Sequence, residues 1–246
     1  MNLNLIFDFN TDITEVDIPK TLNNPFTLDI PEIADIAAKE FQEHITSASK
    51  KWDYDFLTRH GKMFGILVVQ RKDKRYSFLG TNSGALPGNS DHNRLIPSVF
   101  DNTTDDYFFD RGMTAVTELC NRINNSTSPS EIINLTEERK VKSYSIQQQL
   151  FQNYHFSNIL GISKNILEIF ELSSHGIPPA ATGECAAPKL LQFAFDHDLK
   201  PIAIAEFWWG NPTKNQEKKH KHYYPACKNK CRPLLEYMLN DTELYE

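Results

Sequence analysis

One stretch, residues 63–69, restricts the fold more than any other, because nearly every residue in it is apolar. A charged turn follows at residues 71–75, and a second apolar run covers residues 76–80. Two such runs around a short polar connection predict a β-hairpin. A strand that is apolar at almost every position is buried on both faces, so we expect the first run to be a central strand covered by helices.

The remaining patterns alternate between helix and strand. Residues 31–49 carry apolar side chains at helical spacing, and residues 201–209 form a buried apolar run that ends at Gly210. Further helices are predicted at residues 131–154, 164–172 and 189–197, and Pro233 is expected to open a last helix through Leu239. We therefore predict a mixed α/β fold, with a central sheet and flanking helices. Residues 1–246 are expected to form one compact accessory domain, with a boundary between two lobes, if there is one, near residues 124–130.

Composition narrows the class of protein. The chain has 246 residues, of which 40% are hydrophobic and 24% charged, which suits a globular domain with a proper core. No run of eighteen apolar residues occurs, and the first ten residues lack a basic start and a small-residue cleavage site. We expect no membrane partner and a cytoplasmic location, where the four cysteines would be reduced thiols or metal ligands.

Charge is unevenly distributed along the chain. Between residues 212 and 232, seven basic residues against one acidic residue give a local charge of +6, which leaves −12 for the rest of a chain whose total is −6. Aromatic residues interleave with these cations, as on surfaces that bind single-stranded nucleic acid. The alternative is a solvated lysine-rich loop. The candidate RNA-binding residues are Lys214, Lys218, Lys219, Lys221, Tyr223, Tyr224, Lys228, Lys230 and Arg232, with Trp208 and Trp209.

Three of the four cysteines precede or enter predicted helices near the end of the chain. A helix N-terminus favours a thiolate, because its unpaired amides and dipole stabilise negative charge. Cys185, Cys227 and Cys231, with His222 as a fourth ligand, are therefore a candidate zinc site. Three partly buried, reduced thiols without a metal are the alternative. Cys120 shares an apolar helical face and is expected to be a core thiol.

The order of strands, helices and cysteines in this segment resembles that of zinc-dependent nucleobase deaminases. In those enzymes a glutamate two residues after the first ligand shuttles protons for the metal-bound water. Here that position is Ala187, and the later cysteine pair has one extra residue between its members. The resemblance implies a deaminase-like three-layer arrangement, whereas the proton shuttle is missing. The further pocket candidates are Glu184, Lys189 and Glu206.

Several longer blocks resemble the N-terminal region of long-form RluA-type RNA pseudouridine synthases. The match covers most of the chain in order, and its most specific blocks lie toward the C-terminal end. The blocks are residues 61–69, 82–86, 97–101, 183–191, 205–210, 224–227 and 230–231.

The family's catalytic motif, of the type His-Arg-Leu-Asp, has no counterpart here. The nearest string is Asn93-Arg94-Leu95-Ile96, which lacks the aspartate, and the helical insert of the family is shortened to residues 126–172. The chain is thus expected to be either the front half of a synthase or a free-standing relative.

The resemblance implies an RNA-binding accessory domain, with structured ribosomal or transfer RNA and a catalytic synthase domain as partners and no nucleotide cofactor. Two alternatives stay open. One is a zinc-dependent hydrolase of the deaminase type acting on a nucleobase or nucleotide. The other is a zinc-clipped module that contacts a partner protein.

Overall fold

The fold is built on a four-stranded sheet. A computed structural model describes residues 3–48, 61–84, 86, 94–100, 108–173, 176–213, 215 and 217–239. The strand order is β1-β3-β2-β6, and β2 (Lys62–Gln70) pairs antiparallel with both β3 (Tyr76–Asn82) and β6 (Lys200–Trp209). The expected hairpin, its central strand and the buried strand near residues 201–209 are all confirmed.

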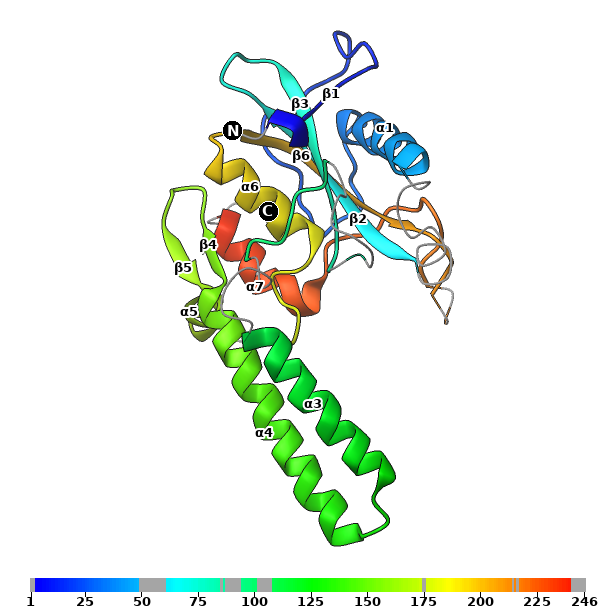
Figure 1. Ribbon diagram of the computed structural model, residues 1–246. Coiled ribbons are helices and arrows are strands. Elements are labelled where there is room, and N and C mark those ends of the chain that lie inside the picture. The colour runs from blue at the N-terminus through cyan, green and yellow to red at the C-terminus, as the bar shows by residue number, and fades with distance from the viewer. Residues whose placement is uncertain are drawn as a thin grey trace.

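Helices cover both faces of this sheet, which confirms the mixed α/β class. Helix α1 (Glu32–Ala48) lies on one face, while α6 (Ala186–Asp196) and α7 (Lys228–Leu239) lie on the other (Figure 1). The molecule therefore has three layers. A relationship to the deaminase fold stays a prediction.

Strand β2 shows why a continuous apolar run belongs at the centre. Successive side chains of a strand point to opposite faces. Phe64, Ile66 and Val68 are buried in the cluster that includes α1, whereas Leu67 and Val69 are buried in the cluster that includes α6 and α7. Each face of β2 thus has its own hydrophobic core, and the strand holds the two cores together.

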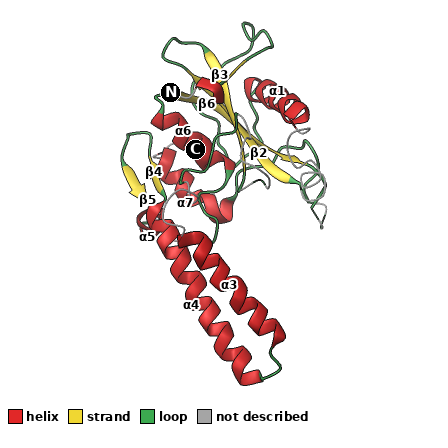
Figure 2. Ribbon diagram, viewed as in Figure 1, coloured by secondary structure: helices red, strands yellow, loops and turns green. Residues whose placement is uncertain are grey.

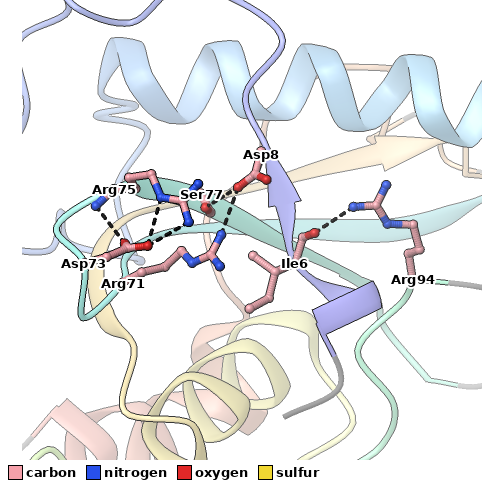
Figure 3. A network of polar contacts seen from close by, with 7 residues as sticks. All are labelled: Ile6, Asp8, Arg71, Asp73, Arg75, Ser77 and Arg94. Carbon is pink, nitrogen blue, oxygen red and sulfur yellow. Dashed lines mark hydrogen bonds and ion pairs between the residues drawn. The ribbon is translucent and has the colours of Figure 1, made fainter.

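Strand β1 (Phe7–Asp8) is an edge strand of the sheet and pairs with β3. Asp8 accepts hydrogen bonds from the Ser77 hydroxyl at 2.9 Å and from the Arg71 guanidinium at 3.1 Å, and Arg94 donates to the carbonyl of Ile6 at 2.7 Å (Figure 3). Because exposed ion pairs add little stability, these contacts mainly fix where the arm after η1 (Leu3–Leu5) joins the sheet.

A long helical hairpin projects from the layered body. It consists of α3 (Phe108–Asn125) and α4 (Pro129–Asn153), and the expected boundary at residues 124–130 coincides with its turn (Figure 2). Beyond α4, the strands β4 (His155–Ser157) and β5 (Ser163–Asn165) form a separate ribbon, and α5 (Ile166–Glu171) follows. The helix predicted over residues 164–172 therefore starts two residues later than expected, at Ile166, because residues 163–165 pair with β4.

The two helices that border the candidate site begin earlier than predicted. Helix α6 starts at Ala186, with Pro188 in its first turn, where no amide is needed. The prediction that Pro233 opens the last helix is wrong, since α7 starts at Lys228 and Pro233 lies inside it. The bond that Pro233 omits would have gone to the carbonyl of Asn229, an exposed residue near the helix start, where water is a ready substitute. As a result Cys231 lies in the first turn of a helix.

Candidate functional site

A pocket of about 460 Å³ lies where the starts of α6 and α7 face strands β2 and β6. The residues that line it come from five stretches of the sequence, namely 62–63, 83–84, 181–186, 206 and 218–230. The ionisable side chains that line it are Lys62, Glu184, Cys185, Glu206, Lys218, Cys227 and Lys230. A pocket that gathers thiols, carboxylates and ammonium groups has the residue types needed to bind anions and to carry out nucleophilic chemistry.

At the start of α6, a carboxylate from the neighbouring strand takes the role of the helix cap. Cys185 occupies the N-cap position without making a side-chain cap bond. Instead, the N–H of Ala187 donates to Glu206 Oε1 at 3.0 Å, and this bond ties β6 to α6. Burial raises the pKa of Glu206 to about 7, although the bond from Ala187 and the charge of Lys218 oppose the rise.

At the start of α7, three thiols meet. Cys231 is completely buried and lies within hydrogen-bond reach of both Cys185 and Cys227. These contacts and its burial hold the pKa of Cys231 well above its usual range, so it stays a protonated thiol that can donate S–H. All three cysteines are free.

Cys227 differs from its two neighbours because the helix amides point to it. The S–H of Cys231 and the backbone N–H groups of Lys230, Asn229 and Cys231 act on its sulfur, and together they outweigh its burial. They lower the pKa of Cys227 to about 5, so it is a thiolate at neutral pH. Since Cys227 also lines the pocket, this anion faces the space that a ligand could enter.

Glu184 also lines the pocket and is held by hydrogen bonds from three other segments. Its carboxylate accepts a hydrogen bond from the Tyr154 hydroxyl and another from the Ser98 hydroxyl, the latter at 2.8 Å. The carbonyl of Glu184 accepts from the N–H of Gly84 at 2.8 Å, which joins this wall to the end of β3. Burial and the neighbouring carboxylate raise the pKa of Tyr154, which therefore remains a hydrogen-bond donor.

Four lysines surround these groups. Lys218 and Lys230 enter from the loop and from α7, and Lys62 enters from β2, where its partial burial lowers its pKa. Lys189 is only 2% exposed on α6, and burial lowers its pKa, whereas the nearby Glu184 and Cys185 favour its charged form. The pocket is thus lined by three ammonium groups together with two carboxyl groups and two thiol groups.

The loop that carries the predicted RNA-binding residues folds back against β6. Trp208 and Trp209 are only 9% and 7% exposed, so little of either ring is free for stacking. The ammonium groups of Lys218 and Lys221 stand 5.6 and 5.4 Å from the ring centroids of Trp208 and Trp209, respectively. The Tyr223 hydroxyl donates to Asp35 on α1 at 2.7 Å. The rings of Trp208 and Trp209 therefore pack under the ammonium groups of Lys218 and Lys221.

The other candidate RNA-binding residues differ in how exposed they are. Lys219, Lys221 and Lys228 are exposed, and Arg232 is half-buried and bonded to Glu236 at 2.7 Å. Tyr224 accepts a bond from the N–H of Lys219 at 2.7 Å. Lys214 lies outside the described residues.

The structure brings together three of the four predicted zinc ligands. His222 is exposed and does not line the pocket, whereas Cys185, Cys227 and Cys231 meet. Across the described part of the chain, no set of three or more His, Cys, Asp or Glu side chains has the spacing of a metal centre. Zinc binding stays a prediction.

Sequence reasoning missed Lys62, Ser98 and Tyr154, which come from other parts of the chain. Only Lys62 left a local signal, a single charge directly before the apolar run of β2. The partners of Glu184 could not be found in this way, because nothing in the local sequence reveals which distant hydroxyl groups will face it.

Within the described ranges, no helix has the length and apolar character required to cross a bilayer. Comparisons with protein-family models, with curated proteins and with solved structures gave no match.

Proposed function

We propose that this chain binds structured RNA, as the accessory domain of an RluA-type pseudouridine synthase. The observation that carries the proposal is the convergence of Lys62, Lys218 and Lys230 on one pocket. Three exposed lysines, at positions 219, 221 and 228, lie in the same stretch of sequence as Lys218 and Lys230. The resemblance of the sequence blocks to the synthases favours RNA over other polyanions, and ribosomal or transfer RNA is the class expected.

Contacts with phosphate, rather than stacking of bases, supply the affinity in this proposal. The indole rings of Trp208 and Trp209 are buried, and Lys218 and Lys221 lie over them. Lysine is a point charge that pairs with phosphate oxygens irrespective of base sequence. Such binding releases counterions, so affinity is expected to fall steeply as salt rises.

Uridine isomerisation itself is assigned to a partner domain. The family's catalytic aspartate has no counterpart in this sequence, and the nearest string has Ile96 where that aspartate would stand. The pocket residues therefore hold RNA in this proposal, and the catalytic aspartate belongs to a synthase domain.

The proposal is tested by filter binding of ribosomal and transfer RNA over a range of salt concentrations. The variant K218E/K219E/K221E reverses three charges of the loop. The matched control K20E/K74E/K142E makes the same change in net charge at three exposed lysines outside the loop and the pocket. We expect the loop variant alone to lose affinity. The slope of log affinity against log salt should become shallower by about 2–3, because each lost phosphate contact contributes about 0.7 on single strands and about 0.9 on duplexes.

Equal loss of affinity in both variants would mean that net charge alone attracts the RNA. Unchanged affinity in the loop variant would reject this surface as the binding site. Circular dichroism of both variants checks that neither loses its fold.

A further inference from the structure

The projecting hairpin of α3 and α4 carries a groove of about 560 Å³. Its lining residues fall within 115–122 on α3 and 138–145 on α4, and none of them lines the candidate pocket. On each helix they recur at positions i, i+3, i+4 and i+7, so they form a single face of that helix. Leu119 is buried and Ala115 is half-buried, whereas the other lining residues are exposed. This face of the two helices, here called the hairpin groove, is therefore open to solvent and partly apolar.

Charges of both signs line the hairpin groove in equal number. The acidic residues are Glu118 and Glu138, and the basic residues are Arg122 and Lys142. Within the described ranges, none of these four side chains forms an ion pair or a hydrogen bond. Each helix is also neutral, since α3 has two acidic and two basic residues and α4 has three of each. A balanced surface does not attract a polyanion such as RNA, but it can pair with a copy of itself.

Gly112 and Ile146 show how the two helices are aligned. A Cβ atom on Gly112 would lie 2.7 Å from the side chain of Ile146, so these two residues stand at the same level. A short turn joins Asn125 to Pro129, and the helices run antiparallel (Figure 2). Each residue toward the turn on α3 is therefore matched by one residue toward the turn on α4, with a rise of about 1.5 Å per residue.

The four charges are placed so that opposite signs share a level. Counted toward the turn from that common level, Arg122 lies ten residues along α3 and Glu138 lies eight residues along α4. Glu118 lies six residues along α3, and Lys142 lies four residues along α4. The two members of each pair thus differ by about 3 Å along the helix axis, which a charged side chain easily spans.

We propose that two copies of this chain associate through the hairpin groove, with α3 of each copy lying on α4 of the other. A two-fold axis parallel to the helices gives this arrangement and keeps every residue at its level. Arg122 of each copy then meets Glu138 of the other, and Glu118 meets Lys142 of the other. By symmetry the dimer gains four ion pairs beside the two Leu119 side chains. This association does not depend on RNA binding.

The size of the hairpin groove predicts a weak dimer. Helix α3 has 18 residues and is therefore about 27 Å long, and two packed helices are about 20 Å wide. The face thus measures roughly 500 Å², and two copies would bury roughly 1,000 Å², which is near the lower limit for a specific interface. We therefore expect a reversible dimer whose fraction rises over about 1–200 µM protein.

The test measures the mass of the full chain, without RNA, by sedimentation velocity over that concentration range. The variant R122E/K142E makes all four charges of the hairpin groove acidic, and E118K/E138K makes all four basic. We expect the dissociation constant of each variant alone to rise by about tenfold or more, because like charges then meet across the two-fold axis. An equimolar mixture of the two variants should form a heterodimer at least as tightly as the wild type dimerises, and native mass spectrometry identifies it by its mass.

The control variants R139E/K140E and E131K/E137K make the same changes in net charge at residues of α4 that do not line the hairpin groove. Both should dimerise as the wild type does, and circular dichroism checks that every variant keeps its helices. Wild-type protein that stays monomeric at about 200 µM would overturn the proposal. A dimer that survives in both groove variants, or that is lost in the controls, would place the interface elsewhere and overturn it too. Failure of the two groove variants to form a heterodimer would have the same meaning.

Discussion

The three clustered cysteines show how far chemical character depends on the immediate surroundings of a single residue. Each was predicted to stand beside a helix start, and on that basis all three were equivalent. In the structure they are not, because the α6 amide is bonded to Glu206 and the α7 amides act on Cys227. Which acceptor receives a helix amide is decided by tertiary packing, so it could not be predicted from local sequence.

The first prediction concerns the ionisation of Cys227. Its pKa of about 5 implies that alkylation by iodoacetamide rises through pH 5 and reaches a plateau by neutral pH. The S–H bond from Cys231 is the largest cause of the lowered pKa, so C231A, which removes this donor, should move the midpoint to higher pH. Peptide mass spectrometry over a pH series measures the rate at this thiol separately from that at Cys120. A midpoint near the ordinary thiol value in the wild type would contradict the assigned contacts.

A second prediction follows from Glu206, whose pKa is raised from 4.5 to about 7 by burial. Between these two values the folded chain holds a proton that the unfolded chain has lost. The free energy of unfolding therefore falls by about 3 kcal/mol as pH rises through this window, and the loss is complete above the folded pKa.

The variant E206Q keeps an acceptor for the N–H of Ala187 but does not ionise. The free energy of unfolding of E206Q, relative to that of the wild type, should therefore increase as pH rises from 4.5 to 7 and stay constant above pH 7. Urea denaturation at a series of pH values measures the difference. Parallel curves for the two proteins would show that the carboxyl group is not buried as described.

Among the helices and strands, apolar patterning predicted β2, β3, β6 and α1 well, because each has a strong period or a continuous buried run. Helices α6 and α7 begin earlier than predicted: α6 starts at Ala186 rather than at Lys189, and α7 starts at Lys228 rather than at Pro233. Proline fits the first turn of a helix and costs a bond beyond it, a cost that packing outweighs here, as α7 contributes Leu234, Leu235 and Met238 to the core.

The packing of β2 against α6 supports a third prediction. A Cβ atom on Gly65 would lie 2.8 Å from the Cβ of Ala186, the first residue of α6. Neither atom belongs to a flexible side chain, so G65A should push the strand and the helix apart and lower stability by about 1–3 kcal/mol.

Removing the opposing methyl group should restore much of this loss, so the double variant G65A/A186G is the matched control. Thermal or urea unfolding of the two single variants and the double variant gives the coupling energy. Additive effects of the two substitutions would mean that these elements do not touch at this point. Since Cys185 precedes Ala186, G65A should also alter the alkylation of the thiol cluster.

Over the whole molecule, the candidate site depends on long-range contacts that only the fold creates. Sequence reasoning brought forward Glu184, Cys185, Lys189, Glu206, Cys227 and Cys231 because they lie in one segment with a distinctive composition. It did not find Lys62, which lines the pocket from β2. It also missed Ser98 and Tyr154, whose hydroxyl groups bond to Glu184, because only the folded chain brings these distant segments together.

The projecting hairpin of α3 and α4 has fewer buried residues than the layered body of the molecule. Two described residues of α3, Gly112 and Leu119, are buried, whereas β2 is buried along almost its whole length. Helices with so thin an apolar contact open locally at lower free energy than a central strand. The amides of α3 and of the first half of α4 should therefore exchange with solvent well before those of β2 and β6. Native-state hydrogen exchange with peptide resolution measures this order.

The variant L119A makes that prediction specific to the hairpin. Leu119 is 6% exposed, and loss of a buried leucine side chain costs about 2 kcal/mol or more. If the hairpin opens as a unit of its own, faster exchange will be confined to α3 and α4, and the alkylation profile of Cys227 will not change. If exchange instead accelerates equally in β2 and β6, the hairpin and the sheet unfold together. The projecting helices would then be part of the cooperative core on which the pocket depends.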